Sequence, residues 1–82
     1  MSDNSLMSQS LVDVDARGMN CPMPLLKAKQ ALNKLEKGDH LQVLATDAGS
    51  QRDFQVFCQQ SGHILEQTEE HQGVYTYIIC KQ

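Results

Sequence analysis

The alternation of strand and helix patterns along the chain constrains its fold most. Residues 11–15 (LVDVD) alternate apolar and polar side chains, as a half-buried strand does. Apolar residues then recur at positions 25, 28, 32 and 35, the spacing of one face of a helix that ends near Leu35. Residues 40–46 (HLQVLAT) alternate again. The first half of the chain therefore predicts a β-α-β unit.

The second half continues with a second helix and two more strands. Residues 51–61 place Phe54 and Cys58 on one helical face, Ser50 is a candidate N-cap, and Gly62 ends the helix. Residues 63–70 and 74–80 read as two strands joined by a tight turn, and the last is rich in aromatic and β-branched residues.

The resulting order is β-α-β-α-β-β, which predicts a two-layer α/β sandwich. Two helices cover one face of a mixed four-stranded sheet. We expect each β-α-β unit to bring its two strands side by side in parallel, and the last two strands to form an antiparallel hairpin. Residues 1–10 are expected to form a flexible N-terminal tail, and residues 11–82 a single domain.

A chain of 82 residues has room for one modest core. It is too small to enclose a deep substrate cavity, so any chemistry is expected at an exposed edge that a partner's surface completes. The net charge is −3 and the pI about 5.4, without the basic excess of a nucleic-acid binder. Protein partners are therefore expected, with no direct nucleic-acid binding, and a monomer is the default.

Cysteine usage and the polar N-terminus indicate a cytoplasmic protein. The three cysteines are an odd number and lie far apart, unlike a secreted disulfide framework. The opening MSDNSLMSQS has neither the basic start nor the apolar run of a signal peptide. No apolar stretch approaches the roughly 20 residues that span a bilayer. We expect a reducing compartment, where a free thiol persists.

Cys21-Pro22-Met23-Pro24 is the most informative site in the sequence. Proline is well tolerated in a first helical turn, so these residues are predicted to open the first helix. Free N–H groups and the positive end of the helix dipole would favour the reactive thiolate of Cys21, or hold a persulfide anion there. Pro22 and Pro24 would fix the backbone around the thiol. The alternative is a small apolar cysteine buried beside a proline-rich turn.

Apolar residues around this cysteine suggest a docking patch. Met19 precedes it in the loop, and Met23 and Leu26 fall outside the buried helical stripe. Lys27 lies on the exposed side of the same helix and can meet an acidic partner. Scattered surface apolar residues and solvated lysines are the plainer interpretation.

The chain resembles the TusA family of sulfur carrier proteins, also called SirA-like. The residues responsible are Asp15, Gly18, Cys21-Pro22-Met23-Pro24, Gly38-Asp39, Asp47, Arg52-Asp53 and Phe57-Cys58. The resemblance runs from about residue 11 to the end, and implies the same two-layer fold. Two positions depart from the family pattern: Met23 stands where the family often has an acidic residue, and Ala48 follows Asp47 where it often has proline.

The resemblance implies that Cys21 accepts sulfur from a cysteine desulfurase and hands it to an acceptor protein by persulfide exchange, with no cofactor. In one branch of the family the sulfur reaches the wobble uridine of transfer RNAs. Other branches are tied to molybdenum-cofactor enzymes or to sulfur oxidation. A thiol redox module is a rival, although no second cysteine lies near Cys21 in sequence to resolve a mixed disulfide. A non-catalytic regulatory domain is another.

The start of the second helix is expected to join the site. Both helices follow strands of one sheet, so their N-termini should open towards the same edge, with Asp47, Arg52 and Asp53 nearby. Arg52 is a candidate for a positive charge near the persulfide or for gripping a partner. A surface ion pair is the alternative.

The remaining cysteines and histidines carry weaker signals. Cys58 is expected in the core, and Cys80 on the open face of the sheet if the tyrosines of its strand pack under the helices. The three histidines are isolated in sequence, and no cysteine or histidine pair has the spacing of metal ligands. The sequence therefore predicts no metal site.

Overall fold

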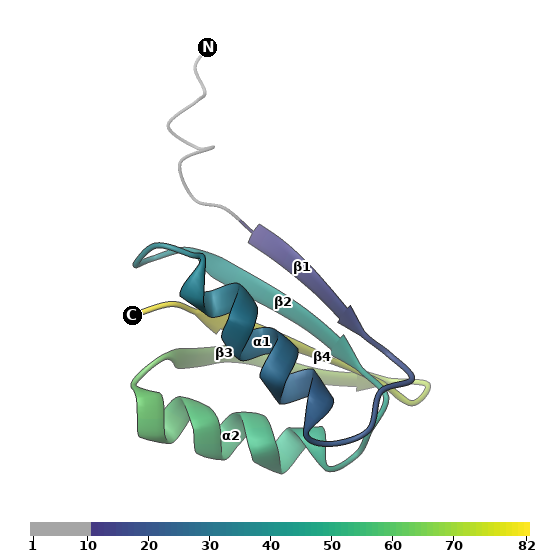
Figure 1. The fold of residues 1–82 in the computed structure, drawn as a ribbon. Helices are drawn as coiled ribbons and strands as arrows, with labels where there is room; N and C mark the ends of the chain where they lie inside the picture. The colour runs from purple at the N-terminus through teal and green to yellow at the C-terminus, as the bar shows by residue number, and fades with distance from the viewer. Residues whose placement is uncertain (1–10) are drawn as a thin grey trace.

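The structure is a computed structural model that describes residues 11–82, so the expected tail at residues 1–10 lies outside the described residues. Its elements follow the predicted order (Figure 1). They are β1 (Leu11–Ala16), α1 (Met23–Asn33), β2 (His40–Ala45), α2 (Ser50–Ser61), β3 (Ile64–His71) and β4 (Val74–Cys80). The predicted β-α-β-α-β-β sandwich is confirmed.

The strands lie in the order β1-β2-β4-β3. β1 and β2 are parallel neighbours, and β4 runs antiparallel to both β2 and β3. The prediction that β2 and β3 would also lie side by side is wrong, because β4 is inserted between them. The apolar, β-branched β4 suits the central position, whereas β3 (ILEQTEEH) is mostly exposed and suits an edge.

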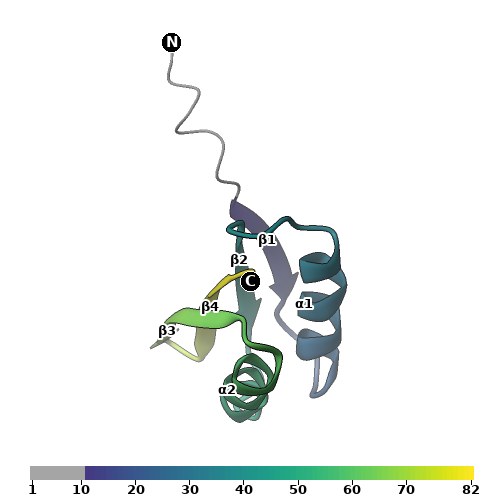
Figure 2. The ribbon, with the colours of Figure 1, turned by 90° about the vertical axis from the view of Figure 1, so that its left-hand side faces the viewer.

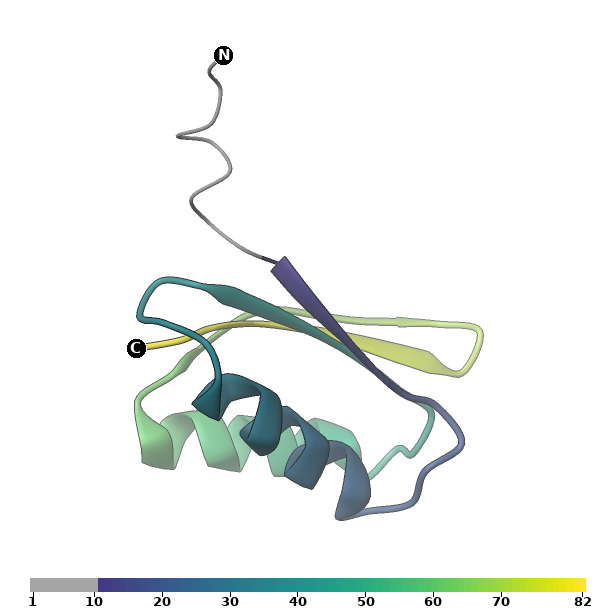
Figure 3. The same cartoon turned by 45° about the horizontal axis from the view of Figure 1, so that its top comes forward.

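Both helices cover one face of the sheet (Figure 3). α1 lies against β1 and β2, and α2 lies against β3 (Figure 2). The alternation predicted for β2 is confirmed, since Leu41, Val43 and Ala45 are fully buried beneath the helices. The core also holds Ala28, Leu32, Phe54, Cys58, Tyr77 and Ile79.

The beginning of α2 differs from its prediction. Gly49 is the N-cap, no side chain caps the helix, and Ser50 is already helical. The Ser50 hydroxyl is instead buried, 2.6 Å from the hydroxyl of Tyr77. A buried tyrosine hydroxyl needs a hydrogen-bond partner, and this need outweighs the capping preference of serine. The contact ties the first turn of α2 to the central strand β4.

We expect Ser50→Ala to lower the free energy of unfolding by about 1–3 kcal/mol, because it leaves the buried Tyr77 hydroxyl without a partner. Tyr77→Phe should have a similar cost, because it leaves the buried Ser50 hydroxyl without its partner. The double variant should cost less than the sum of the two single variants, measured by urea denaturation. Additive losses would show that the two hydroxyls are not coupled.

Candidate functional site

Cys21 lies exposed in the loop between β1 and α1. The sequence predicted that Cys21 to Pro24 open the helix. The helix begins at Met23, with Pro22 at the N-cap and Pro24 buried in the first turn. Proline is tolerated there because its missing N–H would have no partner within the helix. Cys21 therefore stands just before the helix rather than within it.

Two loops hold each other at this edge of the sheet. β1 and β2 are parallel neighbours, so the segments that follow them leave the sheet side by side. The Gly18 N–H donates to Thr46 Oγ1 at 2.9 Å, and the Cys21 N–H donates to Asp47 Oδ2 at 3.0 Å. Asp47 thus holds the backbone of Cys21 in place, and the two hydrogen bonds together join the two loops.

The thiol itself donates to the first turn of α2. Cys21 Sγ lies 2.6 Å from Asp53 Oδ2. The two helix N-termini therefore meet at one edge, as the strand–helix order suggested. Arg52 was the sequence candidate for a charge near the sulfur, but the side chain that contacts the sulfur is Asp53. Successive helical residues point about 100° apart, and the burial of Ser50 and Phe54 fixes which one faces Cys21.

The acidic surroundings raise the pKa of Cys21 above its ordinary value. The largest cause is the hydrogen bond to Asp53, followed by desolvation and then by the charges of Asp53 and Asp47. The expectation that the helix end favours the thiolate is therefore wrong for the free protein. A helix N-terminus supplies about half a positive charge, whereas two full negative charges face this sulfur. Cys21 rests as a thiol.

We expect Asp53→Asn to lower the pKa of Cys21 and to speed its alkylation. The variant removes the largest cause of the raised pKa, and each unit by which the pKa falls multiplies the thiolate fraction about tenfold below the midpoint. At a pH between the Cys21 pKa values of the two proteins, the wild-type thiol is mostly protonated and the thiol of the variant is mostly ionised. The check is the pH profile of the iodoacetamide reaction, followed on the Cys21 peptide. Asp13→Asn, on exposed β1, is the matched control; coinciding midpoints for Asp53→Asn and wild type would contradict the assignment.

Exposed or half-buried apolar side chains lie close to Cys21 in the sequence. Met23 and Leu26 are 44% and 42% exposed, and Met19 is half-buried. Val56 on α2 is 40% exposed as well, which the sequence pattern did not indicate. A shallow hollow of about 190 Å³ lies between the helices, lined by Leu25, Lys29, Arg52, Asp53, Val56, Phe57 and Gln60.

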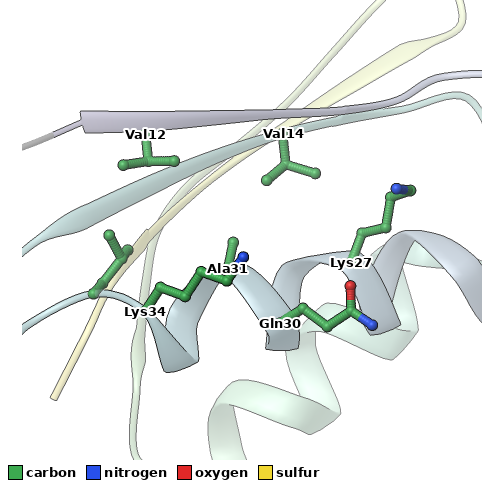
Figure 4. Close-up of a pocket in the computed structure, with 7 residues that line it drawn as sticks. Val12, Val14, Lys27, Gln30, Ala31 and Lys34 are labelled. Carbon is green, nitrogen blue, oxygen red and sulfur yellow. The ribbon is translucent and has the colours of Figure 1, made fainter.

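A larger hollow of about 440 Å³ lies between β1 and α1 (Figure 4). Its lining residues are Val12, Val14, Lys27, Gln30, Ala31, Lys34 and Leu35. Val12 and Val14 point from the strand towards the helix, and Lys27 borders the opening. Lys27 thus lies on the β1 side of α1, whereas Asp53 reaches Cys21 from α2. Cys21 does not line this hollow, and its thiol is exposed.

The other two cysteines occupy the predicted positions. Cys58 is 6% exposed in the core, where burial raises the pKa of its thiol. Cys80 is half-buried at the end of β4. All three thiols are free.

A family model described as "Sulfurtransferase TusA" matches residues 12–81. The chain belongs to the TusA family. It is 44% identical over 69 residues to the sulfur carrier protein TusA of Allochromatium vinosum, covering 84% of this chain and 91% of that protein. The TusA of a Pseudomonas putida strain is 41% identical, with 84% and 86% covered. A crystal structure of a SirA-like protein from Desulfitobacterium hafniense superposes with a TM-score of 0.75 at 33% identity, over 84% of this chain and 95% of that one.

No helix among residues 11–82 is long and apolar enough to cross a membrane.

Proposed function

We propose that this protein is a sulfur carrier that holds a sulfane sulfur as a persulfide on Cys21 and passes it to an acceptor protein. The observation that carries the proposal is the exposed Cys21 thiol, hydrogen-bonded to Asp53 at the edge where two loops and two helices meet. Membership of a family whose relatives are named sulfur carrier proteins supports it.

Loading begins from the thiol. When the persulfide of a donor approaches, Cys21 transfers its proton to Asp53 Oδ2, only 2.6 Å away, and Sγ attacks the outer sulfur of the donor. A new S–S bond forms on Cys21, the donor's S–S bond breaks, and the donor's cysteine leaves as a thiolate, which takes a proton from solvent. The sulfane sulfur moves with no net oxidation or reduction.

Unloading follows the same chemistry in reverse order. An acceptor thiolate attacks the outer sulfur, and Cys21 regains its proton from Asp53. The hydrogen bond to Asp53 favours the protonated thiol of Cys21, so it stabilises the unloaded form that the transfer leaves behind. The sulfurtransferase activity therefore resides in the complexes with donor and acceptor.

The surface around Cys21 fits transient docking. Met23 and Leu26, in the first turn of α1 after Cys21, are exposed and offer apolar contacts to a partner. The donor is a cysteine desulfurase, and the acceptor is a protein thiol of a relay for transfer RNA thiolation, molybdenum-cofactor enzymes or sulfur oxidation. The protein works as a monomer in the cytoplasm, where its thiols stay reduced.

The proposal is tested by incubating the protein with a cysteine desulfurase and free cysteine, then measuring the intact mass. We expect a gain of one sulfur atom that is reversed by reductant and needs the desulfurase. A mass gain equal to one cysteine instead of one sulfur would indicate a redox module. No gain with an active desulfurase would contradict the carrier function.

A further inference from the structure

Three side chains that can bind a metal ion meet on the face of the sheet that the helices leave uncovered. His40 is on β2, Glu66 on β3 and Cys80 on β4, and one ligand atom of each lies within 4.8 Å of the others. His40 Nε2 and Glu66 Oε1 are 3.1 Å apart. The loop between β1 and α1, which contains Cys21, and the helix N-termini lie at the opposite end of the sheet from the C-terminus (Figure 1), so this cluster is separate from the proposed carrier site.

The strand register brings these residues together from distant parts of the sequence. His40 and Cys80 are directly paired across β2 and β4, so their side chains leave the same face as neighbours. Cys80 is also paired with Ile64 at the beginning of β3. The ligands therefore rise from three adjacent strands whose positions are set by backbone hydrogen bonds, which is a rigid base for a site.

An irregularity in β3 supplies the third ligand. The register with β4 shifts between Leu65 and Gln67, which leaves Glu66 without a partner in the ladder. Such a bulge re-aims a side chain and is common beside functional sites. Here it directs the Glu66 carboxylate to His40 on β2, across the intervening strand β4.

The donor set suits Zn²⁺. Imidazole nitrogen, thiolate sulfur and carboxylate oxygen are its three usual protein ligands, at about 2.0–2.3 Å. Around a tetrahedral ion such ligands stand about 3.3–3.8 Å from one another. The three ligand atoms lie within 4.8 Å of one another. Their separations therefore need to shorten by only about 1 Å to surround an ion, and rotation of the side chains can provide this.

The sulfur also has a hydrogen-bond donor beside it. Gln82 Nε2 donates to Cys80 Sγ at 3.6 Å, and the Gln82 backbone N–H is held by His63 Nδ1 at 3.0 Å. An N–H directed at a ligand sulfur supports its thiolate form and fixes its orientation. The chain end thus provides an outer contact for the ligand.

We propose that His40, Glu66 and Cys80 bind one Zn²⁺ ion on the open face of the sheet, leaving a fourth coordination position for water or a small ligand. The ion links β2, β3 and β4 at the end of the sheet remote from Cys21. No sequence pattern indicates this site, because its ligands lie at positions 40, 66 and 80 without the spacing of a metal-binding motif.

The test uses the full chain carrying Cys21→Ser, so that the thiol beside Asp47 and Asp53 cannot bind the metal. Co²⁺ is titrated as a spectroscopic substitute, and Zn²⁺ competition then gives the affinity. We expect one equivalent to bind with a thiolate-to-cobalt charge-transfer band in the near ultraviolet. Cys80→Ser should abolish the band and weaken Zn²⁺ binding more than about 100-fold, and His40→Gln or Glu66→Gln should weaken it about tenfold or more.

Glu69→Gln, on the exposed part of the same strand β3, is the matched control and should leave the affinity unchanged. Circular dichroism checks that each variant is folded. The absence of a charge-transfer band in the folded Cys21→Ser protein would overturn the proposal. So would a Zn²⁺ affinity that Cys80→Ser leaves intact, because binding would then lie elsewhere.

Discussion

Cys21→Ser is expected to lose all desulfurase-dependent sulfur loading. A serine hydroxyl cannot form an S–S bond, and the two remaining thiols are poorly placed to substitute for the missing one. Cys58 is 6% exposed, and burial raises the pKa of its thiol, so it offers little thiolate and no access. Cys80 lies at the end of β4, away from the edge where Cys21 donates a hydrogen bond to Asp53.

The measurement is the intact mass after incubation with a cysteine desulfurase and free cysteine. Cys80→Ser is the matched control, since it removes another accessible thiol while leaving the Cys21 edge intact, and it should load like the wild type. Wild-type loading of Cys21→Ser would contradict the assignment of the carrier residue.

Phe54→Ala is expected to remove about 3–5 kcal/mol of the free energy of unfolding. The Phe54 ring is fully buried and stacks on Tyr77, with the ring centroids 4.6 Å apart. A domain of this size has roughly 4–12 kcal/mol in total, so this one side chain accounts for a large share. The loss should also disturb the site, because Phe54 adjoins Asp53 and sets the rotation of α2.

Urea denaturation followed by circular dichroism measures this effect. Val56→Ala, in the same helix and 40% exposed, is the control and should change the free energy of unfolding by about 0.5 kcal/mol or less. Similar losses for the two variants would show that α2 does not depend on its buried face.

The sequence predicted the elements and the buried faces well, because hydrophobic periodicity directly records which side of a strand or helix faces the core. Leu41, Val43 and Ala45 on β2 are buried as expected, and Gly62 ends α2 in the left-handed conformation. The order of the strands in the sheet was harder to predict from the sequence. The position of β4 between β2 and β3 depends on which strand can be buried on both edges, which is a property of the whole sheet.

The candidate site was only partly predictable for a similar reason. The Cys-Pro-x-Pro motif indicated Cys21, but not the pKa of its thiol. That pKa depends on Asp53 and Asp47, which lie 32 and 26 residues further along the chain and reach the loop of Cys21 only in the folded protein. The rotation of α2 that selects Asp53 over Arg52 is set by the burial of Ser50 and Phe54, both of which contact Tyr77. The cluster of His40, Glu66 and Cys80 likewise exists only across three strands.

The most direct test of the account locates the transferred sulfur in the wild-type chain. After desulfurase treatment the protein is alkylated and digested with trypsin without reductant. Cleavage after arginine and lysine leaves Cys21 alone in the peptide of residues 18–27, and Cys58 and Cys80 together in residues 53–81. We expect an alkylated persulfide on the peptide of residues 18–27. An added sulfur found only on residues 53–81 would contradict it.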